Sequence, residues 1–263
     1  MSRGRLVIAL IVAVISILGY YGSSVMNPVT QEKQHVAGIT PEQEVALGLQ
    51  AAPEMAQQFG GEDPDPKAQA LVDQVGERIV AQSAAGKTPY RYDFHVLNDA
   101  ETINAFALPG GQVFITRALF DKLETEGELA GVLGHETGHV VARHSAEQIA
   151  KTNLTQGLTG AAVIATYDPN NPASMGTAQV AQLIGQLVNL KFGRDDELEA
   201  DKLGVCFMSA AGYDPQEMVG VMQILKAASQ GGGPPEFFST HPDPGNRITH
   251  IQDTIANLDQ CPK

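Results

Sequence analysis

The sequence predicts a mostly helical α+β domain preceded by one N-terminal transmembrane helix, and three observations lead to this prediction. Most of the chain repeats apolar residues at helical spacing, a stretch between residues 90 and 120 has strand character interrupted by turn residues, and residues 6–31 carry no charge. The 263 residues are enough for one sizeable domain with a buried core. We therefore expect an N-terminal segment with its linker over 1–31 and a domain over 32–263.

The charge of the chain argues against nucleic acid as a partner. The formal net charge is −13, and no basic run follows the first five residues. Because binding to phosphates needs a concentrated basic surface, nucleic acid is not expected as the main partner. An acidic surface of this kind is more often a means of staying soluble than a recognition feature.

The N-terminus resembles a membrane anchor. Arg3 and Arg5 precede an apolar run that is long enough to cover a hydrocarbon layer of about 30 Å. Positive charge ahead of the span keeps the N-terminus in the cytoplasm and places the domain outside it, as in the periplasm. The alternative is a cleaved signal peptide, which would release the domain into the same compartment.

Capping and turn residues set the order of the expected elements. Thr40 is the expected N-cap of a first domain helix that Pro53 kinks or breaks. Pro109 and its two following glycines suggest a hairpin or an abrupt strand turn, hence a small antiparallel sheet. Further helices are expected over 67–83, 121–151, 154–166, 177–191, 195–211, 215–230 and 244–258.

The stretch VLGHETGHVVARH carries the clearest chemical signal. His135 and His139 are four residues apart, so on a helix both imidazoles project from one face and can bind a single ion. Glu136 lies between them, where its carboxylate can take a proton from a metal-bound water. The pattern predicts a zinc site on a helix, and the alternative is a pair of core histidines bonded to the backbone.

A catalytic zinc site needs a third protein ligand and an open fourth position. The extended form HExxHxxGxxH is excluded, because Ala142 and Ser145 occupy its glycine and histidine positions. Glu197 in the stretch GRDDELEADKLG is the candidate, with Asp201 one turn later as a partner for a histidine N–H. Glu199 is expected to point elsewhere. The alternative is a solvated acidic helix start, which leaves Asp201 unexplained.

Cys206 and Cys261 permit one disulfide in an oxidising compartment. Closing a loop of this size contributes on the order of 4 kcal/mol in the chain-entropy model. The alternative is a buried thiol at Cys206 and an exposed one near the terminus.

Four stretches resemble the membrane-associated zinc endopeptidases that include the HtpX-type proteases, the mitochondrial Oma-type protease, the CAAX prenyl endopeptidase and the LoiP-like periplasmic proteases. They are NAFALPGGQVFITRALF, GELAGVLGHETGHVVARH, RDDELEADKLG and STHPDPGNRI. The resemblance covers residues 35–258 and implies a gluzincin-type zincin domain with one Zn²⁺ per chain.

The same resemblance implies the site residues. It makes His135, His139 and Glu197 the zinc ligands, Glu136 the general base and Asp201 the supporting member of the ExxxD pair. His241 and Arg247 occupy positions near the substrate carbonyl or the open coordination site. His144 has either a supporting or a surface role, without a further assignment.

The resemblance also implies polypeptide substrates, either misfolded or membrane-proximal. An edge strand within 104–116 would hold them in extended form through main-chain hydrogen bonds, and the alternative is a hairpin that only closes the core. The rival functions are a chaperone-like or binding module with a structural metal, and an interaction subunit that works through its anchor. The sequence does not specify an oligomeric state.

Overall fold

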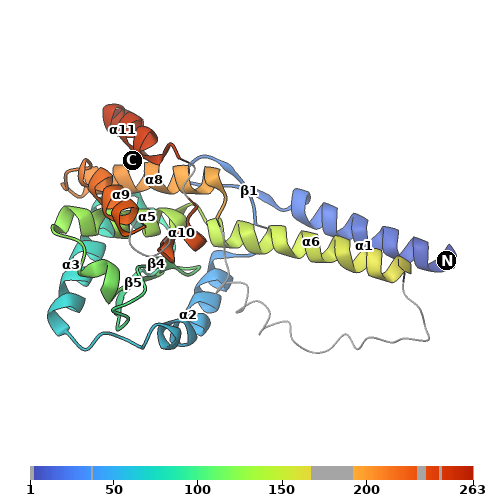
Figure 1. Ribbon diagram of the computed structural model, residues 1–263. Coiled ribbons are helices and arrows are strands. Elements are labelled where there is room, and N and C mark those ends of the chain that lie inside the picture. Colours follow the sequence, from blue (N-terminus) through green and yellow to red (C-terminus); the bar gives the residue numbers. More distant parts are fainter. Residues whose placement is uncertain (1–2, 37, 167–191, 230–234, 243–244, 263) are drawn as a thin grey trace.

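The computed structural model describes residues 3–36, 38–166, 192–229, 235–242 and 245–262. They form a mostly helical body from which two helices project side by side, α1 (Arg3–Gly22) and α6 (His144–Thr166) (Figure 1). A short antiparallel ribbon of β1 (Ser24–Met26) and β2 (Lys33–His35) connects α1 to the body. The expected helix over 177–191 lies outside the described residues.

The body contains a three-stranded sheet in the order β3-β5-β4, formed by β3 (Asp93–Leu97), β4 (Ala105–Ala107) and β5 (Gln112–Thr116). β4 and β5 pair antiparallel as the predicted hairpin, with Gly110 and Gly111 at positive φ in its turn. β3 lies parallel to β5, because residues 98–104 carry the chain past β5 before the hairpin begins. β4 is therefore an edge strand.

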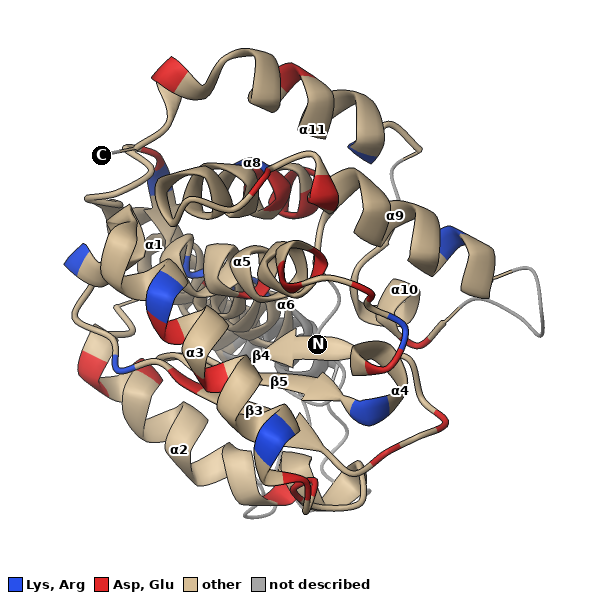
Figure 2. Ribbon diagram, turned by 90° about the vertical axis from the view of Figure 1, so that its left-hand side faces the viewer, with Lys and Arg blue, Asp and Glu red and all other residues tan. Residues whose placement is uncertain are grey.

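Helices surround the sheet and one another, with α5 (Glu126–Val141) at the centre between α8 (Arg194–Ala210) and β4 (Figure 2). Apolar side chains of α5 such as Leu129 and Leu133 are fully buried in the main core. The remaining elements of the body are α2 (Pro41–Gln58), α3 (Pro66–Gln82), η1 (Ala84–Lys87), α4 (Arg117–Phe120), α9 (Glu217–Ala228), α10 (Phe237–Thr240), α11 (Arg247–Ala256) and η2 (Leu258–Gln260).

Most of the expected helices are present, and three expectations need correction. Thr40 is the N-cap of α2 as predicted, within a capping box, but of the expected kink or break at Pro53 the break is absent, because α2 continues through Pro53 to Gln58. The helix expected over 121–151 is divided, since α5 ends at Val141 and α6 begins at His144, and the helix expected over 154–166 is not separate, since α6 runs unbroken to Thr166. The division lies at Arg143, whose φ of 57° is left-handed and incompatible with a continuous α-helix.

The side chain of Arg143 explains how this backbone conformation is held. Its Nε lies 3.2 Å from both carboxylate oxygens of Glu44, and its Nη2 donates to the carbonyl of Ile39 at 2.7 Å. Burial raises the pKa of Glu44, although hydrogen bonds from Tyr90 and Arg143 and the charge of Arg143 oppose the rise. α2 thereby anchors the junction between α5 and α6.

The expectations for the N-terminus and the cysteines have different outcomes. Among the described residues, no helix has the length and apolar character that crossing a membrane requires, so the expected anchor is not confirmed. The disulfide between Cys206 and Cys261 is present and ties the second half of α8 to the C-terminal residues. The division of the chain after residue 31 stays a prediction.

Candidate metal centre

Glycines allow α5 and α8 to approach closely at the site. A Cβ at Gly138 would lie 2.9 Å from the carbonyl oxygen of Ala200, and one at Gly204 would lie 2.9 Å from the backbone nitrogen of His135. Both distances are shorter than the contacts that real Cβ atoms make with backbone atoms. The cost of each glycine inside a helix, about 1 kcal/mol relative to alanine, is therefore offset by packing that brings Glu197 to the histidines.

Four side chains from three parts of the chain converge, and their donor atoms lie within 4.8 Å of one another: His135, His139, Glu197 and His241. The two Nε2 atoms of His135 and His139 are 3.1 Å apart. The Glu197 carboxylate oxygens lie 3.6 Å from His135 Nε2 and 3.5 Å from His139 Nε2. Tetrahedral zinc with bonds of about 2.1 Å keeps its ligand atoms about 3.4 Å apart, so this spacing fits one ion.

The burial and protonation of these groups also fit a metal. Glu197 Oε1 and His241 Nε2 are buried and find no hydrogen-bond partner among the described residues, whereas Glu197 Oε2 has an ion pair with Arg247 Nη1 at 3.0 Å. Such orphaned atoms are costly unless an ion or another ligand satisfies them. Burial is the largest cause that lowers the pKa of His135 and His139, so their neutral rings offer lone pairs.

Glu136 lies beside this cluster and is completely buried. Its Oε1 is 3.6 Å from His241 Nε2. Burial raises its pKa to about 8, against smaller lowering effects of the Arg247 charge and of the Ala107 backbone amide on β4. A carboxyl group with a pKa near neutrality can both accept and return a proton.

Asp201 and Arg247 support the cluster from the side of α8 and α11. Asp201 Oδ1 lies 2.9 Å from His135 Nδ1, which is the contact that the sequence predicted for a supporting carboxylate. Arg247 donates to both oxygens of Asp201 at 2.6 and 2.7 Å and lies 3.0 Å from Glu197 Oε2. Although burial raises the pKa of Asp201, the charges and hydrogen bonds of Arg247 and His135 together outweigh it, so the net pKa is lowered.

Aromatic rings cover the cluster on its remaining side. Phe192 stacks on His139 with ring centroids 4.0 Å apart, and Phe237 of α10 stacks on His241 at 4.4 Å. His241 has no exposed surface, and neither has Glu197. The centre is closed to a peptide in this conformation, and the sequence contained no pattern that marks either phenylalanine as a cover.

All seven residues that the sequence singled out lie in this one centre: His135, Glu136, His139, Glu197, Asp201, His241 and Arg247. His144, for which the sequence allowed a supporting or a surface role, is 1% exposed and lies against His139. Its place depends on the turn at Arg143, which no sequence pattern revealed.

The fold and this donor set define the class of HExxH metallopeptidases with a glutamate from a later helix. Comparison with known proteins agrees: the model of Peptidase family M48 matches residues 66–255. The chain belongs to Peptidase family M48, and the predicted resemblance to membrane-associated zinc endopeptidases is confirmed at the level of the family.

Three relatives illustrate the similarity. The beta-barrel assembly-enhancing protease of Yersinia pestis is 32% identical over 206 residues, which cover 75% of this chain and 41% of the relative. The mitochondrial metalloendopeptidase OMA1 of Schizosaccharomyces pombe is 38% identical over 185 residues, 70% of this chain and 52% of that protein. The metalloprotease YcaL of Escherichia coli is 30% identical over 170 residues, 65% and 64% of the two chains. The chain thus spans about half the length of these relatives.

Proposed function

We propose that this chain is a zinc-dependent endopeptidase in which His135, His139 and Glu197 hold one Zn²⁺ ion and Glu136 is the general base. The observation that carries the proposal is the set of three donor atoms at the spacing of a tetrahedral site, with a buried carboxyl group beside them. Membership of a peptidase family supports the same activity.

Each residue of the centre has a separate role in the proposed reaction. A bound Zn²⁺ ion lowers the pKa of a coordinated water and polarises the scissile carbonyl. Glu136 takes the proton of the attacking water and returns it to the leaving amine. His241, 3.6 Å from Glu136, is placed to donate a hydrogen bond to the oxyanion that develops on the carbonyl oxygen.

We propose for Arg247 a role that differs from the expected one near the substrate carbonyl or the open coordination site. Its guanidinium contacts Asp201, Glu197 and the ring of His135, and the side chain is buried. These contacts support a role in holding two carboxylates in place while its charge compensates theirs. Asp201 in turn accepts the Nδ1–H of His135 and so orients that ring.

We propose polypeptides in extended form as the substrates, in particular misfolded or membrane-proximal proteins. β4 is an edge strand beside the centre, and the pKa of Glu136 responds to the backbone amide of Ala107 at its end. A peptide added to this edge would present its carbonyl next to the base. Because the centre is closed, Phe192 and α10 must move for a peptide to bind.

A casein digestion assay with metal analysis tests the activity on the wild type and on Glu136→Gln. We expect one zinc per chain in both proteins, and a loss of cleavage in the variant, because the amide keeps the shape of the side chain without its basicity. Undiminished cleavage by Glu136→Gln would reject the mechanism, and Glu54→Gln on α2 is the matched control for the chemical change.

The second candidate function is a binding or chaperone-like module with a structural metal. It is favoured by one observation, namely that His241 brings the number of clustered donors to four, and structural zinc sites have four protein ligands. Under this function the wild type binds zinc but does not cleave casein. If the protein is an endopeptidase, the wild type cleaves casein and Glu136→Gln does not.

We also propose that the protein associates with a membrane through α1. Many apolar side chains of α1 are exposed, among them Leu10, Ile15 and Leu18, and large contiguous exposed apolar patches mark interaction sites. Flotation with phospholipid vesicles tests this: the full chain should float, a chain without residues 1–22 should not, and flotation of the shortened chain would refute it.

A further inference from the structure

His144 and Glu199 form a chain of contacts that ends on a proposed zinc ligand. His144 Nδ1 lies 2.9 Å from Nδ1 of His139, and His144 Nε2 lies 3.2 Å from Oε2 of Glu199. The His144 side chain is 1% exposed. On a continuous helix a residue five positions after His139 would face away from it, so the left-handed turn at Arg143 is what brings the rings together.

For a neutral His144 ring, the hydrogen-bond chemistry of these contacts gives a single direction. A carboxylate only accepts hydrogen bonds, so the contact to Glu199 requires a hydrogen on His144 Nε2. A neutral imidazole then has a lone pair on Nδ1, which can accept the Nδ1–H of His139. His139 is thereby left with its lone pair on Nε2, the atom that faces His135 and Glu197.

We infer that Glu199 and His144 are positioning residues that fix the tautomer and the ring orientation in which His139 binds the metal. The inference rests on the proposed zinc site. Both ligating histidines are then oriented by a carboxylate. The Asp201 carboxylate contacts His135 directly, whereas the Glu199 carboxylate acts on His139 through the ring of His144. Both carboxylates stand on α8, as does Glu197.

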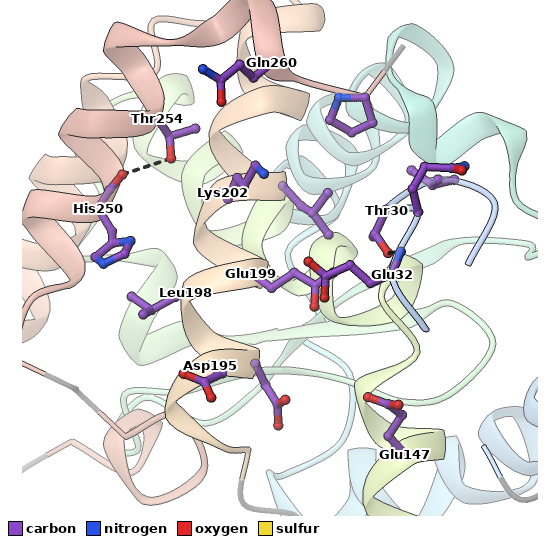
Figure 3. Close-up of a pocket in the computed structure, with 15 residues that line it drawn as sticks. Thr30, Glu32, Glu147, Asp195, Leu198, Glu199, Lys202, His250, Thr254 and Gln260 are labelled. Carbon is purple, nitrogen blue, oxygen red and sulfur yellow. Dashed lines mark hydrogen bonds between the residues drawn. The ribbon is translucent and has the colours of Figure 1, made fainter. Parts of the chain in front are cut away.

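Glu199, at the outer end of this series of contacts, is accessible to solvent. Glu199 lines a cavity of about 510 Å³ between α8, α6, α11 and the residues around Glu32 (Figure 3). The charge of Glu199 is the largest cause that raises the pKa of Glu32 across this cavity. Asp195, also on α8, lines the same cavity and is exposed, which makes it a matched control for the removal of a carboxylate.

Zinc affinity of the full chain, measured by competition with a chromophoric chelator, tests the inference. Loss of a group that orients a metal ligand typically weakens binding about 10- to 100-fold, and we expect this for His144→Leu and about tenfold for Glu199→Ala. His144→Gln should recover most of the affinity, because its amide oxygen can accept the Nδ1–H of His139. Asp195→Ala should bind zinc as the wild type does.

A second measurement reports on the hydrogens themselves. Long-range ¹⁵N–¹H correlation spectra of the zinc-bound wild type should show His144 as the Nε2–H tautomer and His139 as the Nδ1–H tautomer. Glu199→Ala should change the signals of His144. The Nδ1–H tautomer at His144, or wild-type zinc affinity in both His144→Leu and Glu199→Ala, would overturn the inference. Absence of zinc binding by the wild type would refute the proposed function itself, whereas zinc binding without proteolysis would leave this inference standing.

Discussion

A methyl group added at Gly138 tests whether the close approach of α5 and α8 builds the metal site. The added Cβ would lie 2.9 Å from the Ala200 carbonyl oxygen and 3.2 Å from both the Ala200 Cα and the Leu203 Cβ. Two of these three atoms belong to the backbone of α8, which cannot turn aside as a flexible side chain can. The two helices must therefore separate if Gly138→Ala is to fold.

The required separation can be worked out from these contacts. Carbon and oxygen atoms approach to about 3.3 Å, which is about 0.4 Å more than the distance available. Overpacking of this kind costs about 1–3 kcal/mol, and removing a helical glycine returns about 1 kcal/mol, so the net loss of stability is about 0–2 kcal/mol. Metal sites tolerate deviations of only about 0.2 Å, so we expect zinc affinity to fall about 10- to 100-fold.

The assay combines unfolding in denaturant, with zinc and with a chelator, and the competition titration for zinc affinity. Gly131→Ala is the control, because its Cβ would face α9, where it would meet the side chain of Val221 at 3.2 Å and the backbone of Met218 at 3.5 Å, and none of its three nearest atoms belongs to α8. It should bind zinc as the wild type does. If Gly138→Ala also keeps the wild-type zinc affinity, the helix spacing does not set the ligand geometry and the reasoning is wrong.

Three further predictions concern the disulfide, the pH dependence and the buried arginine. Replacing Cys206 and Cys261 by serine opens a bridge between residues 55 apart and should lower the free energy of unfolding by about 4 kcal/mol in the chain-entropy model, while reductant should have no further effect on the variant. The folded pKa of Glu136, about 8, lies above its unfolded value, so the stability it contributes is present at low pH and is lost as pH rises from about 5 through 8; the metal-free protein should show this decline in chemical unfolding, and Glu136→Gln should make it shallower without removing it, because burial also raises the pKa of Glu197. Arg247→Met leaves Asp201 buried without its cation and should cost about 3–5 kcal/mol of stability; a loss below 1 kcal/mol in thermal unfolding would contradict this.

The parts of the centre that follow helical periodicity were predictable from the sequence. His135 and His139 share a face of α5 because they are four residues apart, and the same spacing places Glu197 and Asp201 together on α8. Each pair is set by local geometry. That the two faces meet required the resemblance to known proteases, since no local pattern states which helices pack together.

The parts that depend on a local departure from regular structure were not predictable. The helix predicted over 121–151 is divided because Arg143 adopts a left-handed conformation. Contacts with Glu44 on α2 and with the carbonyl of Ile39, just before α2, stabilise this conformation. A single arginine carries no sequence signal for positive φ, which favours glycine or asparagine. The contact of His144 with His139, on which its proposed role rests, was hidden for the same reason.

The charges of the centre explain why a divalent cation suits it. Arg247 and Asp201 form a buried pair that is close to neutral, with two hydrogen bonds between them. Glu136 and Glu197 then remain without an equal positive partner, and burial raises the pKa of both, so the metal-free cavity favours their protonated forms. Two positive charges of one ion balance the two carboxylates when their protons leave. Metal binding and proton release are therefore coupled in this centre, because neither carboxylate can be charged at low cost until the ion is present.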